Sequence, residues 1–313
     1  MTACRIGMDV GGSKIQLCIE SPDGRLLYDR QWPTGPWSGE PYPRKAARMA
    51  ELIALACQQT GPGLAGQPPV SVGIGAHGCD TPEECATMTK LMSDLLPGTA
   101  CAVVNDAALV ALSAGEQAAG LIAGTGSVAV ARDADGRWLQ TGGWGWVVGD
   151  EGGASGLVRV AIGAVLLDWD RGRQDDPLAL TLVNAFGVKH LLDLPSQLLR
   201  APASDWSRHA PLIFDSLNRD SQLARQVIDA AVTSLTSIIL RLRERGAVFN
   251  RVIAAGSVIR HQPILFDLLA KALIRHDETL TLSLLHSAPV TGALALARHI
   301  APAALSPSLL RGE

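Results

Sequence analysis

The residues best suited to chemistry near the amino terminus are an acid and the glycine-rich turn that follows it. Asp9 lies in the mostly apolar run of residues 6–10, and the turn consists of Gly11, Gly12, Ser13 and Lys14. Glycines let backbone N–H groups approach a ligand closely, and rows of such donors bind phosphate. Because Asp9 would repel a phosphate unless a metal ion stood between them, the pattern favours binding of a Mg²⁺–nucleotide. The simpler interpretation is an ordinary turn with Lys14 in solvent.

A second acidic strand end lies at Asn105 and Asp106. An apolar run at residues 101–104 precedes them, and a helical pattern at 107–114 follows. A carboxylate at such a strand-to-helix step projects toward the place where α/β sheets bind ligands, and it can act as a general base toward a hydroxyl. Either residue could also be the N-cap of the following helix. Capping and catalysis are compatible, so both interpretations stay open on local grounds.

A second glycine-rich turn separates the apolar runs of residues 119–123 and 128–132. Its residues are Gly124, Thr125, Gly126 and Ser127. Because it repeats the strand–turn–strand pattern of the first turn, it would hold phosphates from the opposite half of the protein.

A third turn, at Gly256 and Ser257, follows the apolar run of residues 251–255. Small residues there would let adenine and ribose approach the backbone. An ordinary strand-to-helix turn has the same pattern, and local sequence does not separate the two interpretations.

Asp150 and Glu151 end a glycine-rich segment that includes Gly143 and Trp144. Carboxylates accept hydrogen bonds from sugar hydroxyls and neutralise amino groups, whereas adjacent acids elsewhere commonly face solvent. Trp stacks on the C–H face of a sugar, but core packing is the simpler role. We expect core packing for at least two of Trp32, Trp37, Trp144 and Trp146.

His77 and Asp80 follow the apolar run of residues 70–76, where a strand would end. Their position favours contact with a ligand, although a lone His is more often an ordinary loop residue. The other six His residues show no metal-ligand spacing.

Strand and helix patterns alternate along the chain, which predicts two similar α/β halves that each open with a strand, a glycine turn and a second strand. We expect strands within residues 5–30 and at 70–76, 101–104, 119–123, 128–132, 251–255 and 281–285. We expect helices at 44–60, 82–96, 107–114, 155–170, 177–185, 195–199, 207–216, 221–246, 262–275 and 289–300. Small residues at the start of the last helix would permit close helix packing.

Composition narrows the function classes. The 313 residues are 47% hydrophobic and 18% charged, with a formal net charge of −3, so a large core is expected and no basic run favours nucleic acid. We expect no membrane span, because the apolar runs are short, and no leader before the first strand. Six scattered Cys residues without a C-x-x-C spacing predict reduced thiols in a cytoplasmic protein, and no zinc or iron–sulfur site.

Five features stand in order, at residues 9–14, 105–106, 124–127, 254–257 and 289–297. Together they resemble the sugar kinase–Hsp70–actin superfamily, and most closely its N-acetylglucosamine kinase or BadF-type ATPase branch, which includes glucosamine kinases. The segment at 142–152 is the most diagnostic piece. The resemblance implies an α/β fold with two ribonuclease H-like (actin-like ATPase) lobes around a central cleft. The first lobe would comprise residues 1–112 plus 290–313, and the second residues 113–289.

The same resemblance implies a function, which is transfer of the terminal phosphate of ATP to the 6-hydroxyl of an amino sugar. Asp106 would be the general base and Asp9 would hold Mg²⁺ through water. The sugar would be contacted by Asn105, Asp150, Glu151, His77, Asp80, Gly143 and Trp144. The nucleotide would be contacted by Gly11, Gly12, Ser13, Lys14, Gly124, Thr125, Gly126, Ser127, Gly256 and Ser257. A cytoplasmic homodimer is also implied.

One departure bears on the sugar. N-acetylglucosamine kinases usually have Asn after the Gly-Thr-Gly-Ser segment, and this chain has Val128. The loss of a polar side chain favours glucosamine over N-acetylglucosamine.

Three other functions are alternatives. The first is a BadF-type ATPase that activates a dehydratase through an iron–sulfur cluster, which the scattered Cys residues do not fit. The second is a sugar-responsive repressor, which would need a helix-turn-helix before the first strand. The third is a non-catalytic regulator that binds sugar and nucleotide.

Overall fold

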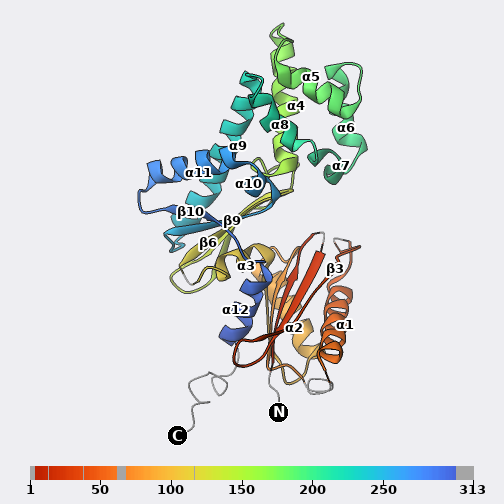
Figure 1. Cartoon of the computed structure of the whole chain (residues 1–313), viewed down its shortest axis with the longest axis vertical. Coiled ribbons are helices and arrows are strands. Elements are labelled where there is room, and N and C mark those ends of the chain that lie inside the picture. Colours follow the sequence, from red (N-terminus) through yellow and green to blue (C-terminus); the bar gives the residue numbers. More distant parts are fainter. Residues whose placement is uncertain (1–3, 13, 38, 62–67, 116, 301–313) are drawn as a thin grey trace. The chain divides into compact units, whose positions relative to one another are not determined.

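The computed structural model describes residues 4–12, 14–37, 39–61, 68–115 and 117–300. The described residues form two compact units. One is drawn from Met1–Glu116 and Leu285–Glu313, and the other from Gln117–Leu284. Figure 1 labels their helices and strands, and each unit is described by itself.

The first unit is a five-stranded sheet with the order β3-β2-β1-β4-β5. Its strands are β1 (Arg5–Val10), β2 (Lys14–Glu20), β3 (Leu26–Pro33), β4 (Ser71–Ala76) and β5 (Ala100–Asn105). Its helices are α1 (Tyr42–Thr60), α2 (Pro82–Leu95), α3 (Asp106–Leu112) and α12 (Val290–Ile300).

The second unit is also built on a five-stranded sheet, with the order β10-β9-β6-β7-β8. Its strands are β6 (Ala118–Ala123), β7 (Ser127–Arg132), β8 (Trp138–Gly142), β9 (Arg251–Ala255) and β10 (Thr281–Leu284). Its longer helices are α4 (Ala154–Asp170), α5 (Pro177–Phe186), α8 (Ala210–Leu217), α9 (Gln222–Glu244) and α11 (Pro263–His276). Its short helices are η1 (Leu191–Asp193), α6 (Leu194–Arg200), α7 (Ala203–Ser207) and α10 (Ser257–His261).

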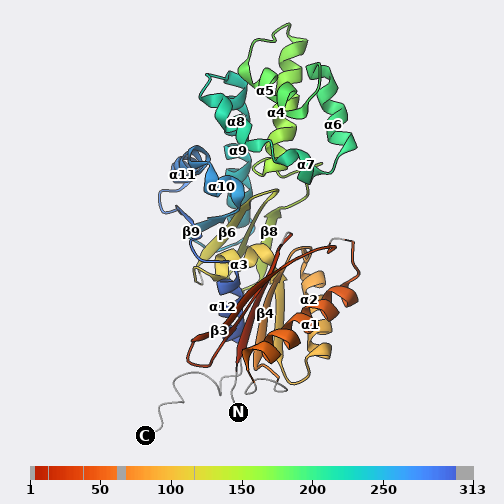
Figure 2. The ribbon, with the colours of Figure 1, turned by 45° about the vertical axis from the view of Figure 1, so that its right-hand side comes forward.

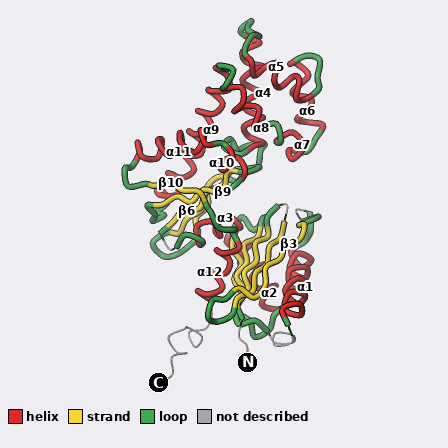
Figure 3. Tube along the Cα trace, in the orientation of Figure 1, coloured by secondary structure: helices red, strands yellow, loops and turns green. Residues whose placement is uncertain are grey.

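The two sheets have the same topology. In each, three consecutive strands pair antiparallel, and two later strands add in parallel on the other side of the first. Figure 3 shows each set of strands gathered in one sheet with helices around it. The two similar α/β halves predicted from the sequence are therefore confirmed, although the sequences of the halves share little beyond the glycine turns.

Side-chain size decides how the helices of the first unit cover its sheet. Ile6 and Met8 of β1 belong to the core that α1 and α2 complete. On the opposite face β1 and β4 present Gly7 and Gly73, and α12 packs directly on them (Figure 2). A Cβ on Gly73 would lie 2.7 Å from the backbone nitrogen of Ala297, so only glycine permits this approach.

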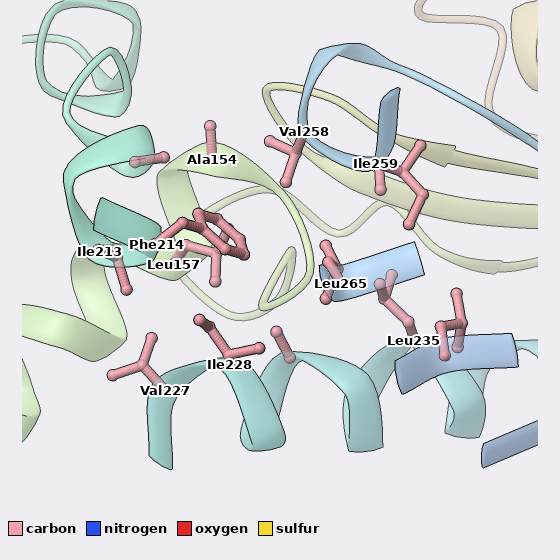
Figure 4. Packing of buried hydrophobic residues seen from close by; sticks show 14 of the residues in the cluster. Ala154, Leu157, Ile213, Phe214, Val227, Ile228, Leu235, Val258, Ile259 and Leu265 are labelled. Carbon is pink, nitrogen blue, oxygen red and sulfur yellow. The ribbon is translucent and has the colours of Figure 1, made fainter. Parts of the chain in front are cut away.

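The largest core lies in the second unit, around α9. Its buried residues recur every three or four positions, as expected for a helix with one apolar face. Figure 4 shows Val227, Ile228 and Leu235 of α9 packed against side chains from several neighbouring elements. This helix joins the sheet to α4 and α8.

The expectation that the chain has no membrane span stays a prediction. Within the described ranges, α9 alone is long and apolar enough to cross a membrane by length and composition. Because 56% of its most apolar window is buried inside the second unit, α9 has the character of a core helix, and the composition test is weak evidence for a span.

The other differences from the predicted elements are local. The predicted helix at 207–216 begins at Ala210, because the chain turns at His209 and Pro211 fits only a first helical turn. A separate short helix, α7, precedes it, and α10 follows Gly256 directly. The strand β8 was not recognised, because Trp138–Gly142 runs into the glycine-rich segment and lacks a clear alternation.

We predict that Gly73→Ala lowers the free energy of unfolding of the first unit by about 1–3 kcal/mol, because the added methyl forces α12 away from β4. Gly39→Ala is the matched control, since nothing lies within 4 Å of a Cβ there. Urea denaturation of both variants measures the difference. Equal stability of the two variants would contradict the close packing of α12.

Candidate functional site

The acids of the first unit are brought together by strand register. β1, β4 and β5 run parallel, and Val10, Ala76 and Asn105 lie side by side in the paired rows. Asp9 therefore lies at the end of β1, while His77 and Asp106 each come one residue beyond that row. Three chain segments that are distant in sequence thus end at one edge of the sheet, where parallel sheets bind ligands.

Burial controls the charge of these acids. Asp9 is only 7% exposed, and its pKa is raised to about 7 by burial and by the nearby charge of Asp106, with Lys14 opposing the shift. The pKa of Asp106 is also raised, mainly by burial, while His77 lowers it and Asp80 raises it further. Two acids that resist ionisation side by side would be relieved by a bound cation.

Asn105 and Asp106 begin α3, and the capping interpretation is confirmed. The Asn105 side-chain oxygen accepts from the Ala107 N–H at 2.9 Å, and Asp106 Oδ1 accepts from the same N–H at 3.0 Å. The Asn105 amide donates to Asp80 at 2.9 Å. Asn105 is therefore engaged at both ends, whereas Asp106 Oδ2 has no hydrogen-bond partner among the described residues and is available to a hydroxyl.

The first glycine turn is a tight hairpin. The Gly11 N–H donates to the Lys14 carbonyl at 3.0 Å, and the Thr34 hydroxyl donates to the Gly11 carbonyl at 2.7 Å. Nothing lies within 4 Å of a Cβ on Gly12, and Lys14 is exposed. Ser13 lies outside the described residues. The hairpin therefore offers its backbone to an outside ligand.

The second glycine turn is a hairpin fastened to the start of α4. The carbonyls of Gly124 and Thr125 accept from the N–H groups of Ala154 and Ser155 at 2.8 and 3.1 Å. Within the described part of the chain, the N–H groups of Thr125 and Gly126 have no acceptor. These two donors remain for a ligand.

Asp150 lies against this second hairpin. It accepts from the Ser127 N–H at 3.1 Å, and a Cβ on Gly126 would be 2.5 Å from its Oδ2. Burial raises the pKa of Asp150. Asp150 also holds a positive φ of 65°, which is uncommon for a residue with a side chain. The structure thus joins a residue predicted to contact sugar with the turn predicted to contact phosphate.

The Glu151 side chain bonds to parts of the second unit other than the hairpin. It pairs with Arg159 at 3.0 Å, and Arg159 also donates to the Gly149 carbonyl. The Ser234 hydroxyl lies 3.4 Å from the other carboxylate oxygen. Glu151 therefore fixes the loop that carries Asp150, and neither acid is a simple solvent-facing residue.

Gly256 and Ser257 meet the second hairpin through the pairing of β6 with β9. A Cβ on Gly256, whose φ is 109°, would be 2.7 Å from the Gly124 nitrogen. Beside this contact lies a hollow of about 230 Å³. Its lining includes Thr125, Ser257, Arg208, Phe214 and His261. The last three were not recognised in the sequence. Arg208 and Phe214 lie just before α8 and in α8, His261 lies at the end of α10, and none of the three is part of a motif.

The Trp residues divide as expected. Trp37 is buried, Trp32 packs on the core of the first unit, and Trp146 packs edge-on against Trp206 with ring centroids 5.2 Å apart. Trp144 is 70% exposed beside Gly143, on the segment that leads to Asp150. Trp144 is therefore the one of the four whose ring is free to meet a ligand.

The six Cys residues are free thiols, and four of them are buried. In the part of the chain that the structure describes, no group of three or more His, Cys, Asp or Glu side chains is placed to hold a metal ion. A divalent ion at Asp9 would therefore need further ligands from water or from a substrate.

Comparisons with known proteins agree with this architecture. The chain is 24% identical over 277 residues to an N-acetylmuramic acid/N-acetylglucosamine kinase of Clostridium acetobutylicum, which covers 86% of this chain and 89% of that protein. It is 23% identical over 288 residues to an N-acetyl-D-glucosamine kinase of Dictyostelium discoideum, covering 87% and 90% of the two chains.

Solved structures show the same fold. A Chromobacterium violaceum protein proposed to be an N-acetylglucosamine kinase superposes with a TM-score of 0.69 at 21% identity, over 95% of this chain and 99% of that one. A ROK family glucokinase of Streptomyces griseus, solved with glucose and AMPPNP, gives 0.52 at 15% identity over 95% and 99%. The predicted α/β fold of the actin-like ATPases is thereby confirmed. Residues 6–297 match the model of the BadF/BadG/BcrA/BcrD ATPase family, and the chain belongs to that family.

Proposed function

We propose that this protein is an ATP-dependent kinase that phosphorylates an amino sugar. The observation that carries the proposal is the position of Asp106, which follows β5 beside Asp9 and keeps one carboxylate oxygen free. Phosphoryl transfer depends on positioning and charge neutralisation. A free carboxylate near the turn proposed to bind phosphate would position the attacking hydroxyl and take its proton, while backbone donors and a bound cation would neutralise the phosphates. Relatives named as kinases of N-acetylated amino sugars support the substrate class.

In the proposed arrangement the first unit holds the acceptor sugar. Asp106 accepts the proton of the sugar 6-hydroxyl as that oxygen attacks the terminal phosphorus of ATP, while the bond from this phosphorus to the β–γ bridging oxygen breaks and ADP leaves with the bonding electrons. His77, Asp80 and Asn105 orient the sugar at the same sheet edge. Residues 1–112 with 290–313 form this functional lobe.

The second lobe, residues 113–289, holds the nucleotide. Thr125 and Gly126 donate to its phosphates, and the hollow beside Ser257 receives adenosine. Asp150, Glu151, Gly143 and Trp144 contact the sugar from this lobe. The contact between Gly124 and Gly256 supports the assignment, because Thr125 of the turn proposed to bind phosphate and Ser257 both line the hollow.

Mg²⁺ fits the residues present. A buried carboxylate whose pKa is raised by a second acid is stabilised by a cation, and Asp9 would hold the ion through water. When bound, the ion would neutralise charge on the phosphates. A cytoplasmic homodimer is the assembly and location that the family resemblance predicts, and both stay predictions.

The sugar is proposed to be glucosamine, with N-acetylglucosamine as the alternative. Val128 supports a free amine, because it removes a polar side chain next to Ser127. The names of the relatives support the acetylated sugar. Parallel ATP-consumption assays with glucosamine, N-acetylglucosamine, mannosamine and glucose decide between them, and turnover on unaminated sugar alone would remove the amino-sugar proposal.

We predict that Asp106→Asn lowers kcat by about 10²–10⁴-fold while ATP binding is kept, because the general base is lost and the nucleotide site is untouched. Steady-state kinetics and calorimetric titration with ATP measure the two effects. Asp94→Asn is the control, since Asp94 is an exposed acid of the same unit that pairs with Lys90 on the surface of α2. Unchanged kcat in Asp106→Asn would refute the base role.

We predict that Asp9→Asn stabilises the metal-free protein at pH 8 by roughly 2–4 kcal/mol. An acid whose folded pKa is raised to about 7 destabilises the fold as pH rises above its unfolded pKa of about 3.9, and the cost is complete above 7. The gain should vanish as pH falls toward 4. Urea denaturation with a chelator at several pH values measures it.

Added Mg²⁺ should then raise the stability of the wild type and leave Asp9→Asn unchanged. A gain in stability that is independent of pH, or an equal response of both proteins to Mg²⁺, would contradict the metal role.

A further inference from the structure

The loop between β4 and α2 is held by three side chains that bond three successive carbonyls. The Trp37 indole N–H donates to the His77 carbonyl at 2.8 Å. The Tyr42 hydroxyl donates to the Gly78 carbonyl at 3.4 Å, and the Asn105 amide donates to the Cys79 carbonyl at 3.3 Å. The donors come from the segment before α1, from α1 and from β5, so the loop is fixed from three directions.

The next two backbone groups of the loop are also satisfied by protein. Glu84 of α2 accepts from the N–H groups of Asp80 and Thr81 at 2.8 and 3.0 Å. The Glu84 N–H donates in turn to the Thr81 hydroxyl oxygen, which completes a capping box at the start of α2. A surface loop normally leaves such groups to water, whereas here the protein holds them in one conformation.

A buried lysine holds the two aromatic donors together. The Lys45 ammonium lies 5.3 Å from the Trp37 ring centroid and 5.2 Å from the Tyr42 ring centroid. Lys45 is 7% exposed, and among the described residues its ammonium forms no ion pair within 4 Å. Its attraction to the two rings restricts both donors, and its charge also lowers the pKa of Asp80, against the larger effect of burial.

Trp37, Tyr42 and Lys45, here called the clamp, form part of the wall of a hollow of about 450 Å³ in the first unit. The lining includes Trp37, Tyr42, Lys45, His77 and Asp80. The hollow thus contains the loop residues proposed to contact sugar together with the side chains that hold the loop.

We propose that Trp37 and Tyr42 are positioning residues that hold His77 and Asp80 in place beside Asp106 before any ligand binds. The proposal rests on the kinase function proposed above for its catalytic consequence, but not for the clamp itself. Trp37 acts through its N–H on the loop, and its buried ring is not a stacking surface for sugar. A loop fixed in advance spares the sugar the entropic cost of ordering it.

The test compares substitutions that remove single donors. Trp37→Phe and Tyr42→Phe each keep an aromatic ring near Lys45. Trp37→Phe loses the bond to the His77 carbonyl, and Tyr42→Phe loses the bond to the Gly78 carbonyl together with the interaction of the hydroxyl with Glu84. Trp32→Phe and Tyr28→Phe are the matched controls in the same unit, because Trp32 packs on the core and the Tyr28 hydroxyl bonds to the exposed Gln59, away from the loop.

We expect each test variant to lower kcat/KM for sugar by about 10–100-fold, largely through KM for sugar, with KM for ATP unchanged. A general loss of stability would not raise KM for sugar while leaving KM for ATP unchanged. Amide hydrogen exchange in residues 77–81 should become faster in the test variants and stay at the wild-type rate in the controls.

Wild-type exchange rates in both test variants would overturn the clamp, whatever the enzyme does. Faster exchange with unchanged sugar kinetics would overturn the positioning role. A wild type that phosphorylates no sugar, combined with faster exchange in the test variants, would refute the proposed function while leaving the clamp supported.

Discussion

The parallel register of β1, β4 and β5 is the constraint on which the first unit depends. Hydrogen bonding sets Val10, Ala76 and Asn105 in one row, so whatever follows each strand meets at one edge. That edge collects Asp9 and Asp106, whose charges then oppose each other. Glycines on β1 and β4 let α12 cover the back of the sheet closely.

In the second unit, the register of two parallel strands brings two glycine turns together. Pairing of β6 with β9 sets Ile122 beside Ala255, and the turns that follow come into contact at Gly124 and Gly256. One copy of the topology thereby collects acids, and the other collects backbone donors.

Second-layer contacts decide how firmly these groups are held. Asp150 fastens the second hairpin through Ser127, and Glu151 is held in turn by Arg159. In the first unit, side-chain donors take the place of water on the β4–α2 loop. Asp106 keeps one carboxylate oxygen without a partner among the described residues, while Trp37, Tyr42 and Asn105 hold the loop beside it, which is the kind of arrangement that preorganisation requires.

The sequence alone determined the elements and the chemistry of the strand ends. Period-two and helical patterns are local, so most strands and helices were predicted within a few residues, and acids or glycines at strand ends were visible as candidates. Sheet pairing decided which strand ends meet, and it brings together residues as far apart in the sequence as Gly124 and Gly256. The role of Trp37 was likewise invisible, because a buried indole that bonds a distant carbonyl has the same local sequence as one that only fills space. Long-range register and burial are properties of the packed chain, so only the tertiary structure could supply them.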